Sequence, residues 1–305
     1  ISWDNYTDGH NNTTHCDCQS GDDDLDYSHR LGLCEEVAPA PQTIHVPGDH
    51  ATIAAAIAAA SDGDTIQIAA GTYNETDIEF DKSITIVGAV DETGLPTTII
   101  DGQNASHIMV LDSSTGATSA FENLVFRGGS GTNPFAGGLS IVGAGATVAN
   151  CTFEYNVTGN SGGGLMALDL PLPLLVSDCR FQNNTASGYG GGARVFGVDV
   201  TVQDCVFTDN QANHGGGMIA DGGNSVQTIQ RCTFQDNTAG VDGGGLYVWS
   251  YSTVTMDDCT ITGNTASVEG GGIYRLEGAG TLTILNNTVC DNWPDAVVGD
   301  YVDGG

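Results

Sequence analysis

Basic residues are scarce in this chain, and the scarcity restricts its partners. Only 7 Lys and Arg stand against 38 Asp and Glu, which gives a formal net charge of -31 at pH 7. Nucleic acids and anionic membrane surfaces are bound through clusters of Lys and Arg. The composition therefore argues against both, and we expect no nucleic-acid partner. Strong acidity suits a protein that stays soluble in salt or gathers divalent cations.

Long apolar runs are also missing. No stretch reaches the roughly 18 consecutive apolar residues that make a candidate transmembrane helix, so we expect no membrane span. The sequence starts at Ile1 without a charged, apolar-cored leader, as the mature form of a secreted protein would.

A repeated motif dominates residues 123–292. Five copies begin with a cysteine, have Phe or Ile two residues later and end in an asparagine, and each leads through a polar gap to three glycines. The cysteines are Cys151, Cys179, Cys205, Cys232 and Cys259, and the asparagines are Asn156, Asn184, Asn210, Asn237 and Asn264. The period of 26 to 28 residues is typical of a solenoid.

Apolar residues alternate within each repeat, which predicts strands. The pattern indicates three short strands per coil, each with one column of side chains facing inward. We therefore predict an all-β fold, a right-handed single-stranded parallel β-helix. Asn123 and Asn287 are expected to continue the cysteine column in the outer copies. The asparagine column is expected to occupy a tight turn in the left-handed region.

Eight of the nine cysteines fall into two groups. Cys16, Cys18 and Cys34 lie in an Asp-rich segment and are interpreted as disulfide staples. The five repeat cysteines would stack about 4.8 Å apart, which is within disulfide reach. Two uses stay open, disulfides between coils or buried thiols, and the second is favoured because cysteine is a commonly buried residue. Zinc or iron–sulfur ligation is not favoured, because the coil sets the spacing.

The N-terminal part differs from the repeats. Residues 1–40 form a Cys/Asp-rich segment and linker, in which Asp22, Asp23, Asp24 and Asp26 are candidate calcium ligands, with a solvated acidic loop as the alternative. No other cofactor is expected. Residues 41–305 are assigned to the β-helix. A short amphipathic helix at about 51–60 is expected to cap the first coil.

Two stretches resemble known families. Residues 51–102 resemble the opening of pectinesterases and other secreted β-helix proteins, with a Thr-Ile-x-x-Ala-Ile helix, Ala-Gly-Thr-Tyr-x-Glu and Ile-Ile-Asp-Gly. Residues 123–292 resemble the polymorphic outer-membrane-protein repeats of adhesins, with Phe-x-x-Asn and Gly-Gly-x-Ile signatures. These resemblances imply a β-helix. The catalytic segments of pectinesterases, Gly-Tyr-Gln-Asp-Thr-Leu and Asp-Phe-Ile-Phe-Gly, do not occur, so no activity is carried over.

The strand after each glycine triplet carries the candidate binding surface. Alternation places a strip of mostly apolar side chains on its outer side: Met166, Leu168, Phe196, Ile219, Tyr247, Trp249, Tyr274 and Leu276. An exposed apolar strip of this kind marks a binding face. Sugar rings, a second copy of the protein, or this chain's own residues 1–40 are the three candidates to cover it. Arg194 and Asp221 on the same strands are interpreted as a surface ion pair, with a catalytic pair as the less favoured reading.

Sequons point to a secreted or cell-surface location. The candidate N-glycosylation sites are Asn5, Asn11, Asn74, Asn104, Asn150, Asn183 and Asn286. We predict a non-enzymatic extracellular structural or adhesive protein that self-associates, with filaments as one form of the assembly. The alternative is a carbohydrate-active enzyme or glycan-binding module for pectin- or alginate-type polysaccharides, acting through the aromatic part of the strip.

Overall fold

The computed structural model describes residues 40–303, apart from 114, 115, 133, 198, 223, 224, 250, 277 and 279. The chain divides into two compact units, Ile1–Gln42 and Thr43–Gly305, and the fold described here is that of the second. The calcium prediction at Asp22, Asp23, Asp24 and Asp26 lies outside the described residues. No helix among the described residues is long and apolar enough to cross a membrane.

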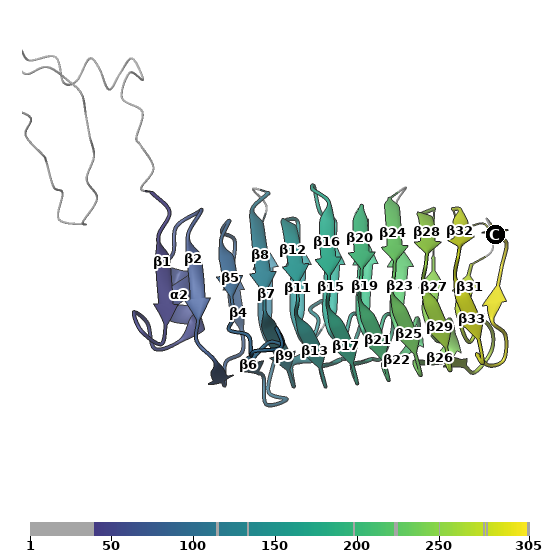
Figure 1. Cartoon of the computed structure of the whole chain (residues 1–305), viewed down its shortest axis with the longest axis horizontal. Helices are drawn as coiled ribbons and strands as arrows, with labels where there is room; N and C mark the ends of the chain where they lie inside the picture. Colours follow the sequence, from purple (N-terminus) through teal and green to yellow (C-terminus); the bar gives the residue numbers. More distant parts are fainter. Residues whose placement is uncertain are drawn as a thin grey trace, which may run out of the picture. The chain divides into compact units, whose positions relative to one another are not determined.

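Parallel strands from successive coils build four sheets along one axis (Figure 1). Sheet 1 has eleven strands: β1 (Thr43–Val46), β2 (Thr65–Ile68), β5 (Thr85–Val87), β8 (Thr118–Glu122), β12 (Gly145–Ala149), β16 (Leu174–Ser177), β20 (Val200–Gln203), β24 (Val226–Gln230), β28 (Thr253–Asp257), β32 (Leu282–Leu285) and β35 (Val302–Asp303). Sheet 2 has nine strands: β3 (Gly71–Tyr73), β6 (Thr98–Asp101), β9 (Leu124–Arg127), β13 (Thr152–Glu154), β17 (Arg180–Gln182), β21 (Val206–Thr208), β25 (Thr233–Gln235), β29 (Thr260–Thr262) and β33 (Thr288–Cys290).

The other two sheets complete each coil. Sheet 3 has six strands: β10 (Ser130–Gly131), β14 (Val157–Thr158), β18 (Thr185–Ala186), β22 (Gln211–His214), β26 (Thr238–Asp242) and β30 (Thr265–Ala266). Sheet 4 has nine: β4 (Ile78–Phe80), β7 (Met109–Asp112), β11 (Leu139–Val142), β15 (Leu165–Leu168), β19 (Ala193–Phe196), β23 (Met218–Asp221), β27 (Leu246–Val248), β31 (Ile273–Arg275) and β34 (Val297–Val298). The predicted three strands per coil are therefore three long sheets, with a short fourth sheet in the middle of the stack.

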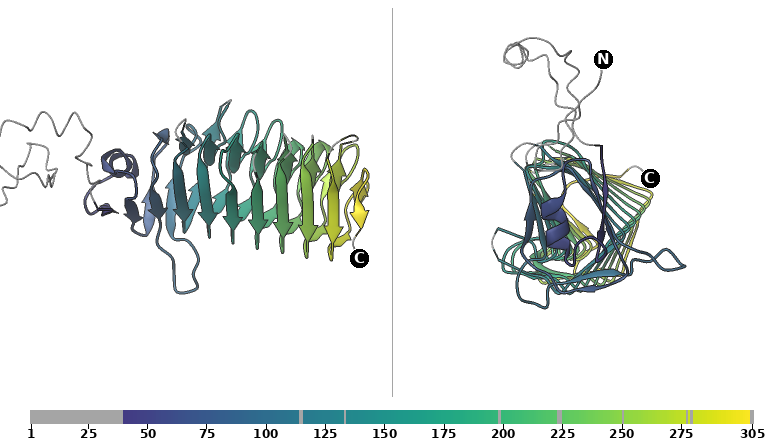
Figure 2. Two further views of the ribbon diagram at one scale, coloured as in Figure 1. Left: turned by 90° about the horizontal axis from the view of Figure 1, so that it is seen from above. Right: turned by 90° about the vertical axis from the view of Figure 1, so that its left-hand side faces the viewer.

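Columns of identical side chains fill the interior. Phe126, Phe153, Phe181, Phe207 and Phe234 are buried, and neighbouring rings stack with centroids 4.5–5.0 Å apart and planes within 5° of parallel. Seen end-on, the coils superimpose around one interior (Figure 2). Each coil thus buries its aromatic ring against the rings above and below it.

The asparagine column lies beside this phenylalanine column and is also buried. The Asn184 side chain shows the pattern: its amide nitrogen donates to Phe153 O at 2.9 Å and to Asn210 Oδ1 at 3.0 Å. Its own Oδ1 accepts a backbone bond from Asn156 at 3.1 Å. The ladder therefore satisfies turn groups that would otherwise be buried without partners.

Two details of these turns correct the sequence-based expectation. The left-handed residue is the one before each column residue, such as Asn183 (φ 55°) before Asn184 and Asp178 (φ 56°) before Cys179. Strand register also pairs Thr152 with Val125, which places Leu124 in the cysteine column in place of Asn123. Asn123, with a φ of 59°, occupies the left-handed column, because Asn tolerates this region and Leu does not. At the other end the expected residue is found, since Asn287 Oδ1 accepts a bond from Cys259 N at 2.7 Å.

The first coil is covered by helix α2 (Ile53–Ala59), within the predicted 51–60. The helix buries Ile53, Ala56 and Ile57 and lies at the N-terminal end of the coils (Figure 2). Glu75 accepts hydrogen bonds from the backbone N–H groups of Ile53 and Ala54. Lys82 donates to three carbonyl oxygens at the opposite helix end, including Ile57 O at 2.8 Å. Both charges complement the helix dipole and pin the helix over the core.

Candidate functional site

The outer side of sheet 4 carries the predicted strip in two ranks. Register aligns Met166, Arg194, Ile219, Tyr247 and Tyr274 in the first rank. Leu168, Phe196 and Asp221 are aligned in the second rank. Trp249 and Leu276 come one residue after the ends of strands β27 and β31.

Part of this strip is buried, which corrects the expectation of an exposed face. Met166, Ile219 and Tyr247 are 1%, 0% and 5% exposed. Leu168, Phe196, Trp249, Tyr274 and Leu276 are half-buried. Three of the five side chains of the first rank are therefore buried outside the core of the coils.

The cover comes from the turn before each glycine triplet. At Gly162 (φ +68°) an added Cβ would lie 2.5 Å from Leu165 O and 2.9 Å from the Met166 Cβ, so only glycine lets the turn approach the strand this closely. Neighbouring turns pair in parallel and form a row that we call the roof: Ser161, Tyr189, His214, Asp242 and Glu269. The chain thus covers the strip with its own loop residues.

Arg194 and Asp221 meet beneath this roof. Arg194 Nη2 lies 3.2 Å from Asp221 Oδ2, and Nη1 donates to Ser161 Oγ at 3.0 Å. The guanidinium carbon lies 5.5 Å from the Tyr189 ring centroid and 5.6 Å from that of Phe196. The two side chains are 18% and 6% exposed. The expected surface ion pair therefore forms, but it is largely buried and enclosed by aromatic rings.

His214 occupies the next position of the roof. Its Nδ1 is 3.6 Å from Asp242 Oδ2, and its ring lies between Tyr189, stacked at 5.4 Å, and Tyr247, edge-on at 5.2 Å. Tyr247 also stacks on Tyr274 at 5.2 Å. Burial raises the pKa of the Tyr247 phenol well above its usual range, and nearby Tyr274 and Asp242 add to the shift. The rings thus pack mainly against one another.

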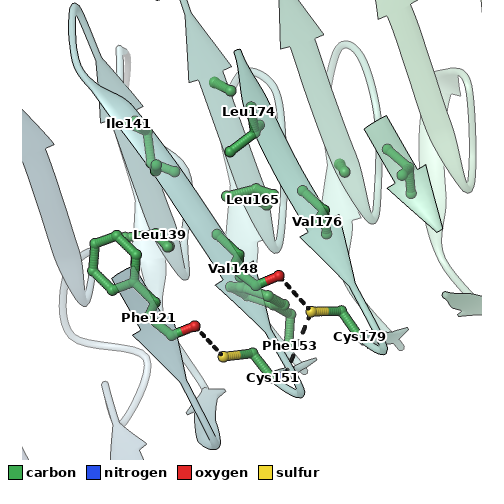
Figure 3. Packing of buried hydrophobic residues seen from close by; sticks show 14 of the residues in the cluster. Phe121, Leu139, Ile141, Val148, Cys151, Phe153, Leu165, Leu174, Val176 and Cys179 are labelled. Carbon is green, nitrogen blue, oxygen red and sulfur yellow. Dashed lines mark hydrogen bonds between the residues drawn. The ribbon is translucent and has the colours of Figure 1, made fainter. Parts of the chain in front are cut away.

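A second cluster of chemically competent groups lies in the core. The five repeat cysteines are buried free thiols, one per coil. Cys179 Sγ lies 3.6 Å from Val148 O of the preceding coil and accepts a bond from Cys151 N at 3.5 Å (Figure 3). Burial raises the pKa of the Cys179 and Cys205 thiols. The repeat cysteines are therefore buried thiols, the use that the sequence favoured over disulfides between coils.

The remaining predicted positions are surface features. Asn74, Asn104, Asn183 and Asn286 are exposed and Asn150 is half-buried, whereas Asn5 and Asn11 lie outside the described residues. No group of three or more His, Cys, Asp or Glu side chains in the described part of the chain is arranged to hold a metal ion.

The roof residues were not found from the sequence. The polar gaps that hold Ser161, Tyr189 and His214 have nearly the same length but share no residue type at the position before the triplet, so residue type gives no signal there. The first glycine of each triplet could have predicted these turns, because a glycine at a fixed place in every repeat indicates that the backbone approaches a neighbouring segment closely.

The parallel coils, the internal ladders and the helix over one end define a parallel β-solenoid. A family model described as the right handed beta helix region matches 97–242 and 137–303. These matches span more than half of the chain, so the chain belongs to this family, and its coils are right-handed. A search of curated proteins finds no match.

Three solved structures are similar to this chain at low identity. A pectin methylesterase from Aspergillus niger is 14% identical, with a TM-score of 0.45, over 87% of this chain and 91% of that one. A pectate lyase is 13% identical, with a TM-score of 0.47, over 86% and 79%. An alginate lyase of the PL6 family is 16% identical, with a TM-score of 0.46, over 84% and 41%, so this chain spans less than half of its length.

Proposed function

We propose that this protein is a non-enzymatic, extracellular structural or adhesive β-helix that self-associates. One observation supports a non-enzymatic role: the strongest candidate catalytic groups, Arg194 and Asp221, already form an ion pair with each other. Arg194 is held by Asp221 and Ser161 and enclosed by rings, so neither charge is presented to a substrate. The resemblance of the repeats to those of adhesins and the sequons support the extracellular role.

Replacing Asp221 tests this assignment. Asp221→Asn keeps the shape but removes the charge that compensates the buried Arg194. We expect the free energy of unfolding to fall by about 2 kcal/mol, less than for a fully buried pair because water still reaches the guanidinium. Urea unfolding measures the change. Assays on pectin, alginate and neutral glycans are expected to show no turnover in either form; turnover by the wild type that is lost in Asp221→Asn would contradict the proposal.

Self-association is proposed to use the last described coil. Among residues 40–303 that the structure describes, β33, β34 and β35 each pair with one strand, and Trp293, Tyr301 and Val302 are 71%, 47% and 59% exposed. A hollow of about 390 Å³ lined in part by Ile284 and Val289 opens beside them. Strand edges next to exposed apolar side chains are templates for another chain, and a second copy offers a matching surface. Because α2 covers the opposite end, this contact joins two copies end to end, and a filament would need a further lateral contact.

Sedimentation velocity over a range of protein concentrations checks this contact. We expect a concentration-dependent dimer that high salt strengthens, because salt screens repulsion between two chains of charge -31. Val302→Lys adds charge to the edge and is expected to keep the protein monomeric, whereas Val157→Lys, at an exposed valine of β14, is the matched control. A wild type that stays monomeric at all concentrations would overturn this part of the proposal alone.

A second candidate function is glycan binding at the half-buried rings. Tyr189, Trp249 and Tyr274 lie along the roofed face, with the Tyr189 and Trp249 centroids 4.9 Å apart. Aromatic faces stack on sugar rings, while the chain's charge disfavours polyanionic pectate or alginate chains. Affinity electrophoresis in gels with neutral or acidic polysaccharides distinguishes the two classes. Retardation of the wild type that Trp249→Ala removes would favour this second function.

A further inference from the structure

The column of five buried thiols has a regular geometry. Each sulfur lies 3.1–3.3 Å from the carbonyl oxygen two residues earlier in its own coil. Each also lies 3.5–3.7 Å from a carbonyl oxygen of the preceding coil. Because the five side chains make equivalent contacts, they share one orientation. Consecutive sulfur atoms therefore repeat at the spacing of the coils, about 4.8 Å.

This spacing suits a particular kind of ligand. It is far longer than the roughly 2.05 Å of a disulfide, so forming one would require two neighbouring side chains to leave the orientation that they share. It is close to the length of two metal–thiolate bonds of about 2.3 Å placed end to end. Soft sulfur ligands select cations such as Cu(I). Cu(I) and Ag(I) accept two ligands in a line, whereas zinc needs four and the column offers two sulfur atoms between any two coils.

We propose that neighbouring thiols of this column bind a soft, two-coordinate monovalent cation of the Cu(I) or Ag(I) class between their sulfur atoms. One thiol loses its proton to solvent and the other keeps its own. The cation, the thiolate and the thiol together are then electrically neutral, as a dry interior requires. This inference is independent of the proposed adhesive role.

Backbone groups are already placed to stabilise the negative charge of a thiolate. Backbone N–H groups of the preceding coil point at the sulfur atoms of Cys179, Cys205 and Cys259 at 3.4–3.5 Å. These donors stabilise a negative sulfur. Without the cation the same thiols stay protonated, because burial raises the pKa of Cys179 and Cys205. Binding therefore displaces a proton and is expected to tighten as the pH rises.

The test counts silver ions in matched variants of the full chain. Accessible thiols, including the exposed Cys290, are first blocked with N-ethylmaleimide. The protein then receives Ag(I) in chloride-free buffer, is passed through a gel-filtration column in excess histidine, and is analysed by mass spectrometry for silver. A variant with all five column cysteines changed to Ala supplies the background.

Two double variants remove the same number of thiols but leave different spacings. Cys232→Ala with Cys259→Ala leaves three consecutive coils with thiols, and Cys179→Ala with Cys232→Ala leaves thiols two coils apart. Above background we expect about two silver ions in the wild type, about one in the first variant and none in the second. Circular dichroism and the melting temperature confirm that each variant is folded. Equal silver in the two double variants, or none in the wild type, overturns the proposal.

Discussion

The protein is expected to lose stability steeply above about pH 9, at a rate of about 5–6 kcal/mol per pH unit. The cause is the thiol column. Burial raises the pKa of Cys179 and Cys205, and hydrogen bonding with the neighbouring thiol raises the pKa of Cys232 to about 12 and that of Cys259 further. A thiol whose pKa is higher in the folded state stabilises fully below its unfolded pKa of about 8.5. That contribution is lost as the pH rises towards the folded value.

The magnitude follows from proton linkage. Between the unfolded and folded pKa values the unfolded chain has released a proton that the native chain retains, so each such thiol costs about 1.4 kcal/mol per pH unit. Four thiols act together, which gives the rate above. Urea unfolding at pH values from 8 to about 10.5 measures the slope.

Two variants test the source of this slope. Changing Cys179, Cys205, Cys232 and Cys259 together to Ala is expected to flatten the pH dependence, whatever its effect at neutral pH. Cys290→Ala is the control, because Cys290 is exposed and should leave the slope unchanged. A quadruple variant that declines as steeply as the wild type would show that the thiols are not responsible.

Asn210→Leu is expected to lower the free energy of unfolding by about 4 kcal/mol. The Asn210 amide donates to Phe181 O and Asn237 Oδ1, both at 2.9 Å, and its Oδ1 accepts two bonds from Asn184 at 3.0 Å. Leucine has a similar volume but makes none of these bonds. Several buried polar groups then lose a partner, at about 1–3 kcal/mol each.

Asn213→Leu is the matched control. Asn213 is an exposed residue of β22, three positions along the chain, and its replacement is expected to change stability by no more than about 0.5 kcal/mol. Thermal or urea unfolding of both variants decides the comparison. Similar losses in the two would mean that the amide ladder contributes little and that strand packing dominates.

The sequence predicted most of the fold because its signals repeat. Phe181, Cys179 and Asn184 recur with every coil, so their columns and the parallel β-helix followed from the period alone. The weaker copies at the ends of the repeat region gave less reliable predictions of register. Asn123 was placed in the cysteine column by its residue type, whereas pairing puts Leu124 there, since register depends on both neighbouring strands.

The site was predicted less well, for a physical reason. Alternation gives the direction in which Met166 or Tyr247 points relative to its strand, but burial depends on what lies above it. That cover comes from the turn residues Tyr189 and His214, whose position recurs before every triplet but whose residue type does not. The predicted Arg194–Asp221 pair formed, yet its enclosure could not be read from the chain. The predictions at Asn5, Asn11, Asp22, Asp23, Asp24 and Asp26 stay predictions.

In-register stacking of the coils is the claim on which these expectations depend, and cross-linking across neighbouring coils tests it most directly. Thr201 pairs with Thr228, and Thr228 pairs with Thr255, on the outer side of sheet 1. Cysteines introduced at Thr201 and Thr228 are predicted to form a disulfide under mild oxidation, since facing positions lie within the roughly 4.4–6.8 Å that a disulfide needs. Cysteines at Thr201 and Thr255, two coils apart, are predicted to stay reduced. A disulfide in the second pair, or its absence in the first, would contradict the stacked coil.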